Sequence, residues 1–372
     1  MIYADNAATT QIDPEAYEIM QEYLKAEYGN PSSLYSFARE GKKALSKARK
    51  IIAECINALP EEIYFTSGGS ESDSWAIKGT ALYNNEKSCV ITSQIEHHAI
   101  IRACEQLEYL GFPVAYLAPE KDGTILPETL EKTIYSPRLV SIMLANNEIG
   151  TIEPVRELAD IAHLHGAYFH TDAVQAVGHI PIDVQQLGVD MLSASGHKFG
   201  APKGVGFLYI RNGVKILPLI NGGSQEKGIR GGTENVAAIA AMATALNNSI
   251  TSMNNTTLFL NKLTEHFLAL LDDSKIKYSI NGSTQNRLPG HISISFPGKS
   301  GEALLHQLDL KGIYVSTGSA CDSVRTETSH VLQAIKLPEK LAKGTIRITF
   351  GENNSIYDAE AIAIALISSL KK

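Results

Sequence analysis

Short strand patterns and helix patterns alternate along residues 45–210, and this alternation restricts the fold more than any other feature of the chain. A helical pattern at 45–59 ends at Pro60, and a strand at 62–66 leads into a glycine-rich turn. Helices are predicted again at 70–83 and 155–165, and short apolar strands at 89–92, 139–144, 168–171, 191–194 and 205–210. Such alternation predicts an α/β domain with a mostly parallel sheet.

The second part of the chain has a different pattern. A polar stretch at 247–257 interrupts the alternation, and beyond it we predict a helix at 258–271 and strands at 276–280, 292–296 and 345–350. We therefore expect residues 13–250 to form a large domain, and residues 1–12 and 251–372 a smaller α+β domain. A chain of 372 residues is long enough to bury two cores.

Charge and cysteine content exclude several classes of protein. The net charge of -7 argues against a nucleic-acid binder, which would carry a basic patch. The four cysteines, at 55, 89, 104 and 321, have neither disulfide-framework nor zinc-site spacing, which suits a reduced compartment. No signal-peptide pattern is present at the N-terminus, and the longest apolar stretch, 236–246, is too short to span a bilayer. We expect a soluble, cytoplasmic protein with no direct membrane or nucleic-acid partner.

The turn after the strand at 62–66 has the composition of an anion site. Gly68 and Gly69 allow close backbone approach, a helix N-terminus follows, and Ser70 adds a hydroxyl. An ordinary capped turn is the alternative reading. The segment 297–300, Pro-Gly-Lys-Ser, is not a P-loop, because that motif needs glycine at the position of Ser293.

Two further strand ends carry residues suited to the same ligand. Asp172 follows an apolar strand, where a buried carboxylate needs a cationic partner such as a protonated pyridine nitrogen. Lys198 follows another strand, in the setting that a Schiff-base lysine requires, with Ser195 and His197 beside it as phosphate donors. Taken singly, Asp172 could cap a helix and Lys198 could be a surface lysine. Together, the three strand ends contain the parts of a pyridoxal-phosphate site.

The sequence resembles the cysteine desulfurase family, from residue 3 to about residue 351. The matching motifs are residues 5–10, 28–33, 65–72, 96–98, 146–150, 170–175, 195–198, 230–233 and 316–321. This family belongs to class V of the fold-type-I pyridoxal-phosphate enzymes and works as a homodimer. The resemblance implies a large domain with a mostly parallel seven-stranded sheet, a smaller C-terminal α+β domain, and a pyridoxal-5'-phosphate-dependent sulfurtransferase.

The resemblance also implies a role for each site residue. Lys198 would hold the cofactor covalently, Asp172 would pair with its pyridine nitrogen, Gln175 would bond the ring hydroxyl, and His97 would stack on the ring and act as an acid–base. The phosphate ligands would be Gly69, Ser70, Ser195, His197 and, from the other subunit, Thr233. Asn147 and Arg347 would bind the substrate carboxylate, since an arginine fork matches a carboxylate.

Cys321 is the residue that identifies the reaction. By the resemblance, its thiolate takes sulfur from L-cysteine, giving L-alanine and a Cys321 persulfide. The sulfur would pass to an acceptor protein, either an iron–sulfur scaffold or a tRNA-thiolation enzyme. No metal is expected in the resting enzyme, and Cys321 would be at most a transient ligand of an iron–sulfur cluster. A polar, glycine-bearing loop suits an exposed carrier thiol, whereas the other three cysteines lie in helix or strand patterns and read as structural.

Three alternatives share this cofactor site. A class V aminotransferase would have no need of Cys321, and a selenocysteine lyase would run the same chemistry on selenium. An inactive homologue serving as an interaction subunit would be favoured if Lys198, Asp172 or Arg347 were absent, and all three are present.

Overall fold

The computed structural model describes residues 1–83, 86–134, 136–317 and 328–371. Its largest sheet has seven strands in the order β2-β8-β7-β6-β5-β3-β4. All neighbouring pairs are parallel except the two that β8 makes with β2 and β7. The strands are β2 (Ile63–Thr66), β3 (Cys89–Ser93), β4 (Val114–Leu117), β5 (Pro137–Ser141), β6 (Tyr168–Asp172), β7 (Met191–Ser195) and β8 (Gly206–Ile210). The predicted mostly parallel α/β sheet is confirmed.

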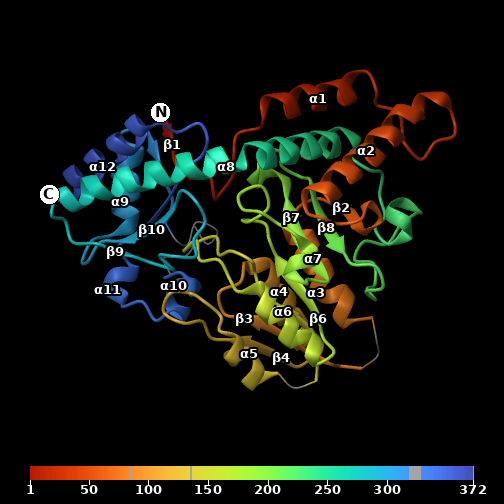
Figure 1. Cartoon of the computed structure of the whole chain (residues 1–372), viewed down its shortest axis with the longest axis horizontal. Coiled ribbons are helices and arrows are strands. Elements are labelled where there is room, and N and C mark those ends of the chain that lie inside the picture. Colours follow the sequence, from red (N-terminus) through yellow and green to blue (C-terminus); the bar gives the residue numbers. More distant parts are fainter. Residues whose placement is uncertain (84–85, 135, 318–327, 372) are drawn as a thin grey trace.

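Helices cover both faces of this sheet (Figure 1). Successive side chains of a strand point to opposite faces, so Leu139 and Met191 pack in one hydrophobic cluster, and Val140 and Leu192 in another. The first cluster contains apolar residues of α3 (Gly69–Ala81) and α4 (His98–Tyr109). The second contains residues of α2 (Arg39–Cys55), α6 (Val155–Leu164) and the first half of α8 (Val236–Asp273). Helices α1 (Pro14–Lys25), α5 (Pro127–Thr133) and α7 (Val184–Leu187) also precede α8 in the chain.

A separate hydrophobic core forms around an antiparallel sheet of β9 (Ser279–Ile280), β10 (His291–Ser295) and β12 (Thr345–Thr349). Helices α9 (Gly301–Asp309) and α12 (Ile356–Leu370) pack on it, and α10 (His330–Ala334) and α11 (Glu339–Ala342) lie nearby (Figure 1). The start of the chain joins this core, because β1 (Ile2–Tyr3) pairs with β11 (Ile313–Tyr314) and Ala4 is fully buried in it.

The predicted break in the helical pattern at 247–257 is wrong, since α8 runs through it as one helix of 38 residues. The polar side chains there have hydrogen-bond partners that are compatible with a helix, some within α8 and some outside it. Thr251 and Ser252 bond carbonyls four residues back, while Asn248 and Ser249 bond Asp13 and the Phe199 carbonyl. The division of the chain into domains near residue 250 stays a prediction, with that boundary now inside a helix.

By length and composition alone, α8 passes the test for a membrane span, which the short apolar run at 236–246 had not indicated. Of the 18-residue apolar stretch of α8 that is long enough to cross a membrane, 56% is buried within the protein. Its first half contributes to one core and its second half, including Leu263 and Phe267, to the other. A buried core helix of a globular protein has these same properties.

Candidate active site

Strands β2, β6 and β7 run in the same direction, so their carboxyl ends meet at one edge of the sheet. Ligands of open α/β sheets bind at such an edge. The three segments singled out in the sequence follow these strands: the turn at 67–70, Asp172 and Lys198. The structure therefore brings together what lies more than a hundred residues apart in the chain.

The turn after β2 forms a close-fitting cradle at the N-terminus of α3. Gly68 has φ 146°, a conformation that favours glycine, and a Cβ there would lie 3.4 Å from Ser195 Oγ. A Cβ on Gly69 would lie 2.7 Å from Val174 Cγ2. The N-terminus of the helix and the hydroxyl of Ser195 are thus neighbours, as an anion site requires. Ser70 is exposed at the first turn of the helix.

An ion pair holds this cradle against the 230–233 segment. Arg230 Nε lies 2.9 Å from Glu71 Oε1, and Glu71 Oε2 accepts a bond from the Ser67 backbone at 2.7 Å. The bond from Arg230 and those from Ser67 lower the pKa of Glu71 even though burial opposes them. Thr233, a few residues on, is exposed in this single chain.

The N-terminal segment lies over Lys198. The Lys198 amine donates to the carbonyl oxygens of Ala7, at 2.5 Å, and Ala8, at 2.9 Å. Gln175 Nε2 also donates to Ala7 O, at 2.9 Å, and His197 Nδ1 lies 3.1 Å from Thr9 Oγ1. Residues predicted to bind the ring and the phosphate are thus held by the first ten residues of the chain, a role that the sequence did not reveal.

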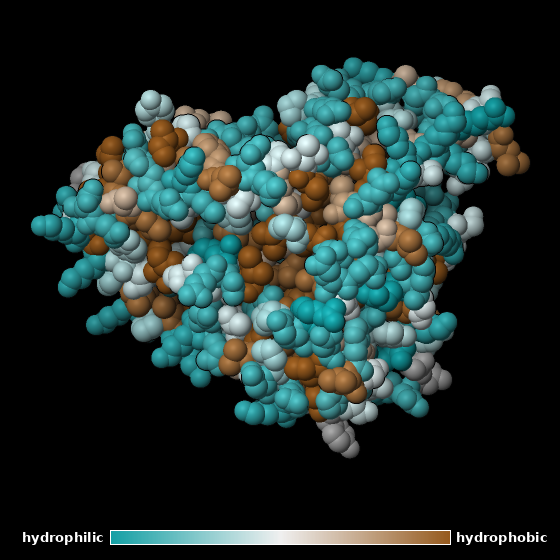
Figure 2. Space-filling view, viewed as in Figure 1, coloured by the Kyte–Doolittle hydropathy of each residue, from teal (hydrophilic) through white to brown (hydrophobic). Residues whose placement is uncertain are grey.

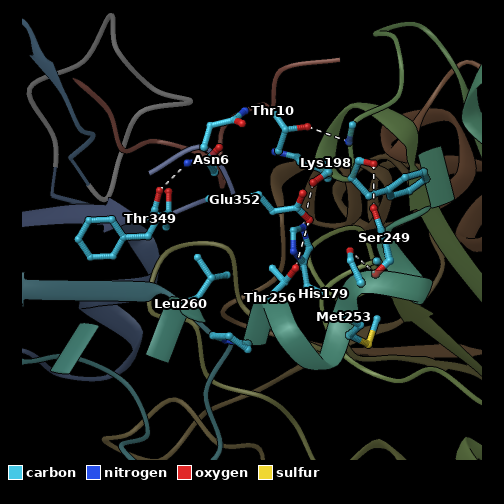
Figure 3. Close-up of a pocket in the computed structure, with 18 of the residues that line it drawn as sticks. Asn6, Thr10, His179, Lys198, Ser249, Met253, Thr256, Leu260, Thr349 and Glu352 are labelled. Carbon is cyan, nitrogen blue, oxygen red and sulfur yellow. Dashed lines mark hydrogen bonds between the residues drawn. The ribbon is translucent and has the colours of Figure 1, made fainter. Parts of the chain in front are cut away.

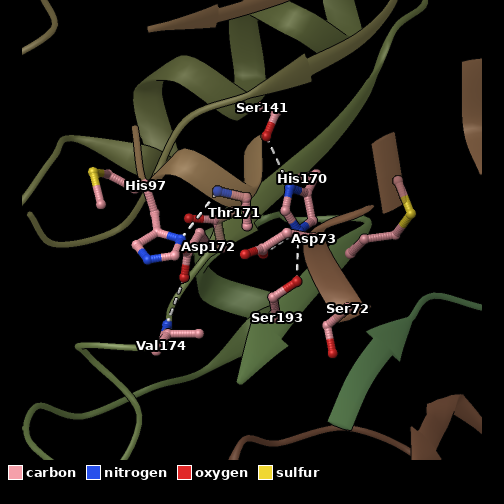
Figure 4. Close-up of polar contacts among 12 residues, drawn as sticks. Ser72, Asp73, His97, Ser141, His170, Thr171, Asp172, Val174 and Ser193 are labelled. Carbon is pink, nitrogen blue, oxygen red and sulfur yellow. Dashed lines mark hydrogen bonds and ion pairs between the residues drawn. The ribbon is translucent and has the colours of Figure 1, made fainter. Parts of the chain in front are cut away.

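Asp172 and His97 face each other at this edge (Figure 4). Asp172 is 4% exposed, and its Oδ1 accepts a bond from the Val174 backbone at 2.9 Å. Burial raises the pKa of Asp172, while the nearby His97 and Lys198 oppose that shift. Burial lowers the pKa of His97, whose Nδ1 caps α4 by accepting a bond from Ala99. A buried carboxylate in this position suits a cationic ring nitrogen.

Arg347 reaches the site from β12 and is 4% exposed. Its Nη2 lies 2.7 Å from Asp5 Oδ1, and its Nη1 donates to the Asn147 carbonyl oxygen at 2.9 Å. Its Nε is buried and has no hydrogen-bond partner among the described residues. Arg347 and Asn147, the two residues predicted to bind the substrate carboxylate, are therefore neighbours, and Asp5 is a partner that the sequence did not reveal.

The segment that leads to Cys321 is attached next to Arg347. Ser316 and Arg347 exchange both backbone hydrogen bonds, at 2.6 and 3.0 Å. Cys321 itself lies outside the described residues.

A cavity of about 400 Å³ lies on the other side of Lys198 (Figure 3). Lys198 and Gln175 line it, together with the N-terminal segment, the middle of α8 and residues 349–353. Neither Asp172 nor His97 belongs to its lining. The half-buried His179 borders it and bonds the Lys198 carbonyl at 2.9 Å, which fixes the backbone of the lysine from this side.

Comparisons with known proteins identify the family of the chain. The aminotransferase class-V family matches residues 2–362. The chain is 50% identical to a cysteine desulfurase IscS of Dictyoglomus turgidum, covering 94% of this chain and 89% of that protein. It is 46% identical to a cysteine desulfurase IscS of Methanosarcina thermophila, covering 97% and 90%.

Among solved structures, a NifS-like protein superposes with a TM-score of 0.94 at 36% identity, covering 100% of this chain and 99% of that one. SspA in complex with cysteine gives a TM-score of 0.86 at 35% identity, covering 95% and 100%. With this fold and these similarities, the chain belongs to the cysteine desulfurase family within the class V aminotransferases.

Proposed function

We propose that the chain takes sulfur from L-cysteine onto Cys321, using pyridoxal 5'-phosphate, and leaves L-alanine. The observation that carries this proposal is the meeting of Lys198, Asp172 and His97 beside the glycine cradle at one sheet edge. Fold and family are those of pyridoxal-phosphate enzymes, and the cradle and the buried carboxylate suit the two ends of that cofactor.

In the proposed arrangement, each residue has one task toward the cofactor. Lys198 binds it covalently, Asp172 pairs with the ring nitrogen, and Gln175 bonds the ring hydroxyl. Its phosphate is bound by Gly69, Ser70, Ser195 and His197, and by Thr233 of the partner subunit. When bound, the cofactor supplies an electron sink for charge that develops on the substrate Cα.

The remaining residues position the substrate and move protons. Arg347, oriented by Asp5, and Asn147 bind the carboxylate. The Lys198 amine takes the Cα proton. His97 is neutral near pH 7 because burial lowers its pKa, so its imidazole can accept the proton of the substrate thiol.

Sulfur transfer exchanges one bond for another. The Cys321 thiolate attacks the substrate sulfur, a sulfur–sulfur bond forms, and the substrate Cβ–Sγ bond breaks. The electron pair of the broken bond stays with the carbon skeleton, which takes up a proton and leaves as alanine. The persulfide then passes its sulfur to an acceptor protein in the cytoplasm, an iron–sulfur scaffold or a tRNA-thiolation enzyme.

The proposal includes a homodimer, because Thr233 is assigned to the partner subunit's phosphate. Exposed apolar side chains near the connection between α1 and α2 support a protein partner: Tyr28, Leu34, Tyr35 and Phe37. That connection projects from the body of the chain (Figure 1), and hydrophobic atoms are visible at its tip (Figure 2). Sedimentation of the cofactor-loaded protein tests this part, and a loaded monomer would contradict it.

The deciding experiment compares Cys321→Ser with wild type. The variant should still bind the cofactor and shift its absorbance on addition of cysteine, but alanine release should fall by orders of magnitude and no persulfide should form. Cys55→Ser is the control, since burial raises the pKa of Cys55 to about 11 and makes it a poor nucleophile. Cysteine turnover at the wild-type rate by Cys321→Ser would refute the proposal. Loss of cysteine turnover alone, with selenocysteine turnover retained, is expected if selenium departs unaided.

A further inference from the structure

A second carboxyl group lies behind Asp172, on helix α3. Asp73 is 1% exposed, and its Oδ1 has no hydrogen-bond partner among the described residues. Three polar atoms meet here: one carboxyl oxygen of Asp73, one of Asp172 and one ring nitrogen of His97. They all lie within 4.8 Å of one another (Figure 4). None of the roles assigned to the cofactor or the substrate uses Asp73.

The histidine beside Asp73 does not compensate its charge. His170 Nε2 lies 3.9 Å from Asp73 Oδ1, but burial lowers the pKa of His170 to about 3, so the ring is neutral. Both ring nitrogens of His170 are hydrogen-bonded to hydroxyl groups. Ser141 Oγ lies 2.8 Å from Nδ1, and Ser193 Oγ lies 2.9 Å from Nε2. A neutral ring between two hydroxyls supplies no positive charge to the carboxyl group.

The other charged groups nearby favour Asp172 as the anion. Burial raises the pKa of Asp73 most, the charge of Asp172 adds to this rise, and Glu96 adds to it least, when it is ionised; only a hydrogen bond from Ser193 opposes them. The positive charge of Lys198 acts on Asp172 instead, and His97, which is neutral near pH 7, would favour the same carboxylate when it is protonated. Two buried carboxylates this close are not both ionised, because desolvation and mutual repulsion add.

Burial also raises the pKa of Glu96 to about 8, so this third carboxyl group is mostly neutral at pH 7. It has its own partners in Ser93 Oγ, at 2.6 Å, and the Met143 backbone, at 3.0 Å. At pH 7, Glu96 therefore adds little negative charge beside the two aspartates.

We propose that Asp73 is a positioning residue that stays protonated and so keeps Asp172 as the single buried anion facing the cofactor. This inference rests on the proposed pairing of Asp172 with the ring nitrogen. The buried cluster of Asp73, His170 and Ser193 then acts as a neutral polar backing. It supports the Asp172 carboxylate and adds no second negative charge that would compete for the proton of the ring nitrogen.

The first test measures cofactor affinity and the pH dependence of the cofactor absorbance in the full-length protein. Asp73→Asn replaces a neutral acid by a neutral amide of the same shape, so the dissociation constant and the absorbance titration should stay close to wild type. Asp172→Asn should raise the dissociation constant about 10-fold or more, the equivalent of about 1.4 kcal/mol. Asp309→Asn, at an exposed position at the end of α9, is the matched control.

Loss of affinity in Asp73→Asn as large as in Asp172→Asn would overturn the inference, because it would place the working charge on Asp73. Unchanged affinity in Asp172→Asn would instead refute the proposed pairing with the ring nitrogen. The protonation of Asp73 would still be decided by the second test.

The second test needs no cofactor. The unfolded Asp73 ionises near its ordinary pKa of about 3.9, while the folded group stays protonated to higher pH, so wild-type stability falls as pH rises between these values. Asp73→Asn removes this fall. Its unfolding free energy should match that of wild type below about pH 4 and exceed it increasingly toward neutral pH. A difference that does not change with pH would overturn the proposal.

A measurement on the wild type covers the case in which Asp73→Asn fails to fold. Infrared spectra of the holoenzyme with isotope-labelled aspartate separate aspartic acid from protonated glutamates such as Glu96. A protonated aspartic acid band at neutral pH supports the proposal, and absence of that band overturns it.

Discussion

The residues proposed to hold the cofactor and those proposed to bind the substrate form two halves of the site, which are assembled in different ways. The cofactor half comes from the ends of neighbouring parallel strands of one sheet, so each residue is placed by the segment that carries it. The substrate half depends on Arg347 meeting Asp5, 342 residues away, and the Asn147 carbonyl, 200 residues away. The first half therefore comes mainly from strand ends, to which the N-terminal segment adds bonds with Lys198, Gln175 and His197. The second half exists only when the two cores and the N-terminal segment have come together.

This contrast extends to the electrostatics. In the cofactor half, Asp172 is buried without a fixed arginine or lysine bridge among the described residues. In the substrate half, Arg347 is already paired with Asp5, their side chains being 4% and 18% exposed. The ion pair orients the guanidinium group, so a change at Asp5 should act on the substrate and leave the cofactor in place.

The largest effect should come from Lys198→Ala. Without the amine, the covalent link to the cofactor is lost, and with it the base for the Cα proton, so alanine production should fall by several orders of magnitude. Borohydride reduction followed by peptide mapping should place the cofactor on Lys198 in the wild type. Attachment to Lys203 instead would show that Lys198 is not the residue that binds the cofactor.

Asp5→Ala should separate the two halves. Arg347 would lose its orienting partner, and kcat/KM for cysteine should fall on the order of 10- to 100-fold. The cofactor absorbance should stay unchanged, because Asp5 contacts none of the proposed cofactor ligands through an ion pair or side-chain bond among the described residues. Cofactor loss in Asp5→Ala would show that the two halves are not independent.

Gly69→Ala tests the cradle alone. The new Cβ would lie 2.7 Å from Val174 Cγ2, so the turn has to shift and the cofactor dissociation constant should rise about 10-fold. The double variant Gly69→Ala/Val174→Ala removes the obstructing methyl group and should restore affinity. No rescue would mean that the backbone of Gly69 itself, not the available space, determines binding.

The smallest effect should come from His163→Gln, behind the sheet and outside both halves. His163 Nε2 lies 2.8 Å from Asp190 Oδ2, and this bond raises the pKa of the histidine. Stability from the pair is fully present below the unfolded pKa of about 6.5 and is lost as pH rises through the higher folded value. Because the pair is partly exposed, the loss in His163→Gln should stay below about 1 kcal/mol at pH 5 and vanish toward pH 8. Urea unfolding at both pH values measures it, with the exposed His306→Gln as control.

The sequence predicted the sheet because its strands have local patterns, and it singled out three segments that the structure brings to one edge of that sheet. Apolar strands ending in glycine, aspartate or lysine are visible in a single stretch of chain, and the structure places those ends together. The continuity of α8 was not predictable from polarity. Asn248 and Ser249 are polar residues within the helix, and their side chains bond Asp13 and the Phe199 carbonyl outside it.

Some missed elements did have signals. Helix α1 begins with Asp13 as its cap and Pro14 in its first turn, and α12 begins with a capping box of Ser355 and Asp358. By contrast, no pattern in the sequence indicates that Asp5 meets Arg347, because that contact depends on where the two ends of the chain lie in three dimensions.

The N-terminal segment also fixes the order in which the protein can be completed during synthesis. Ala4 and Asn6 bond backbone groups of Tyr314 and Thr349, so these two residues find their partners only after a further 300 or more residues have been synthesised. Until then, the carbonyl groups of Ala7 and Ala8 that receive the Lys198 amine are not held in place. The large sheet can form early from its own contiguous residues, whereas a finished active site is possible only after residue 349 has been synthesised.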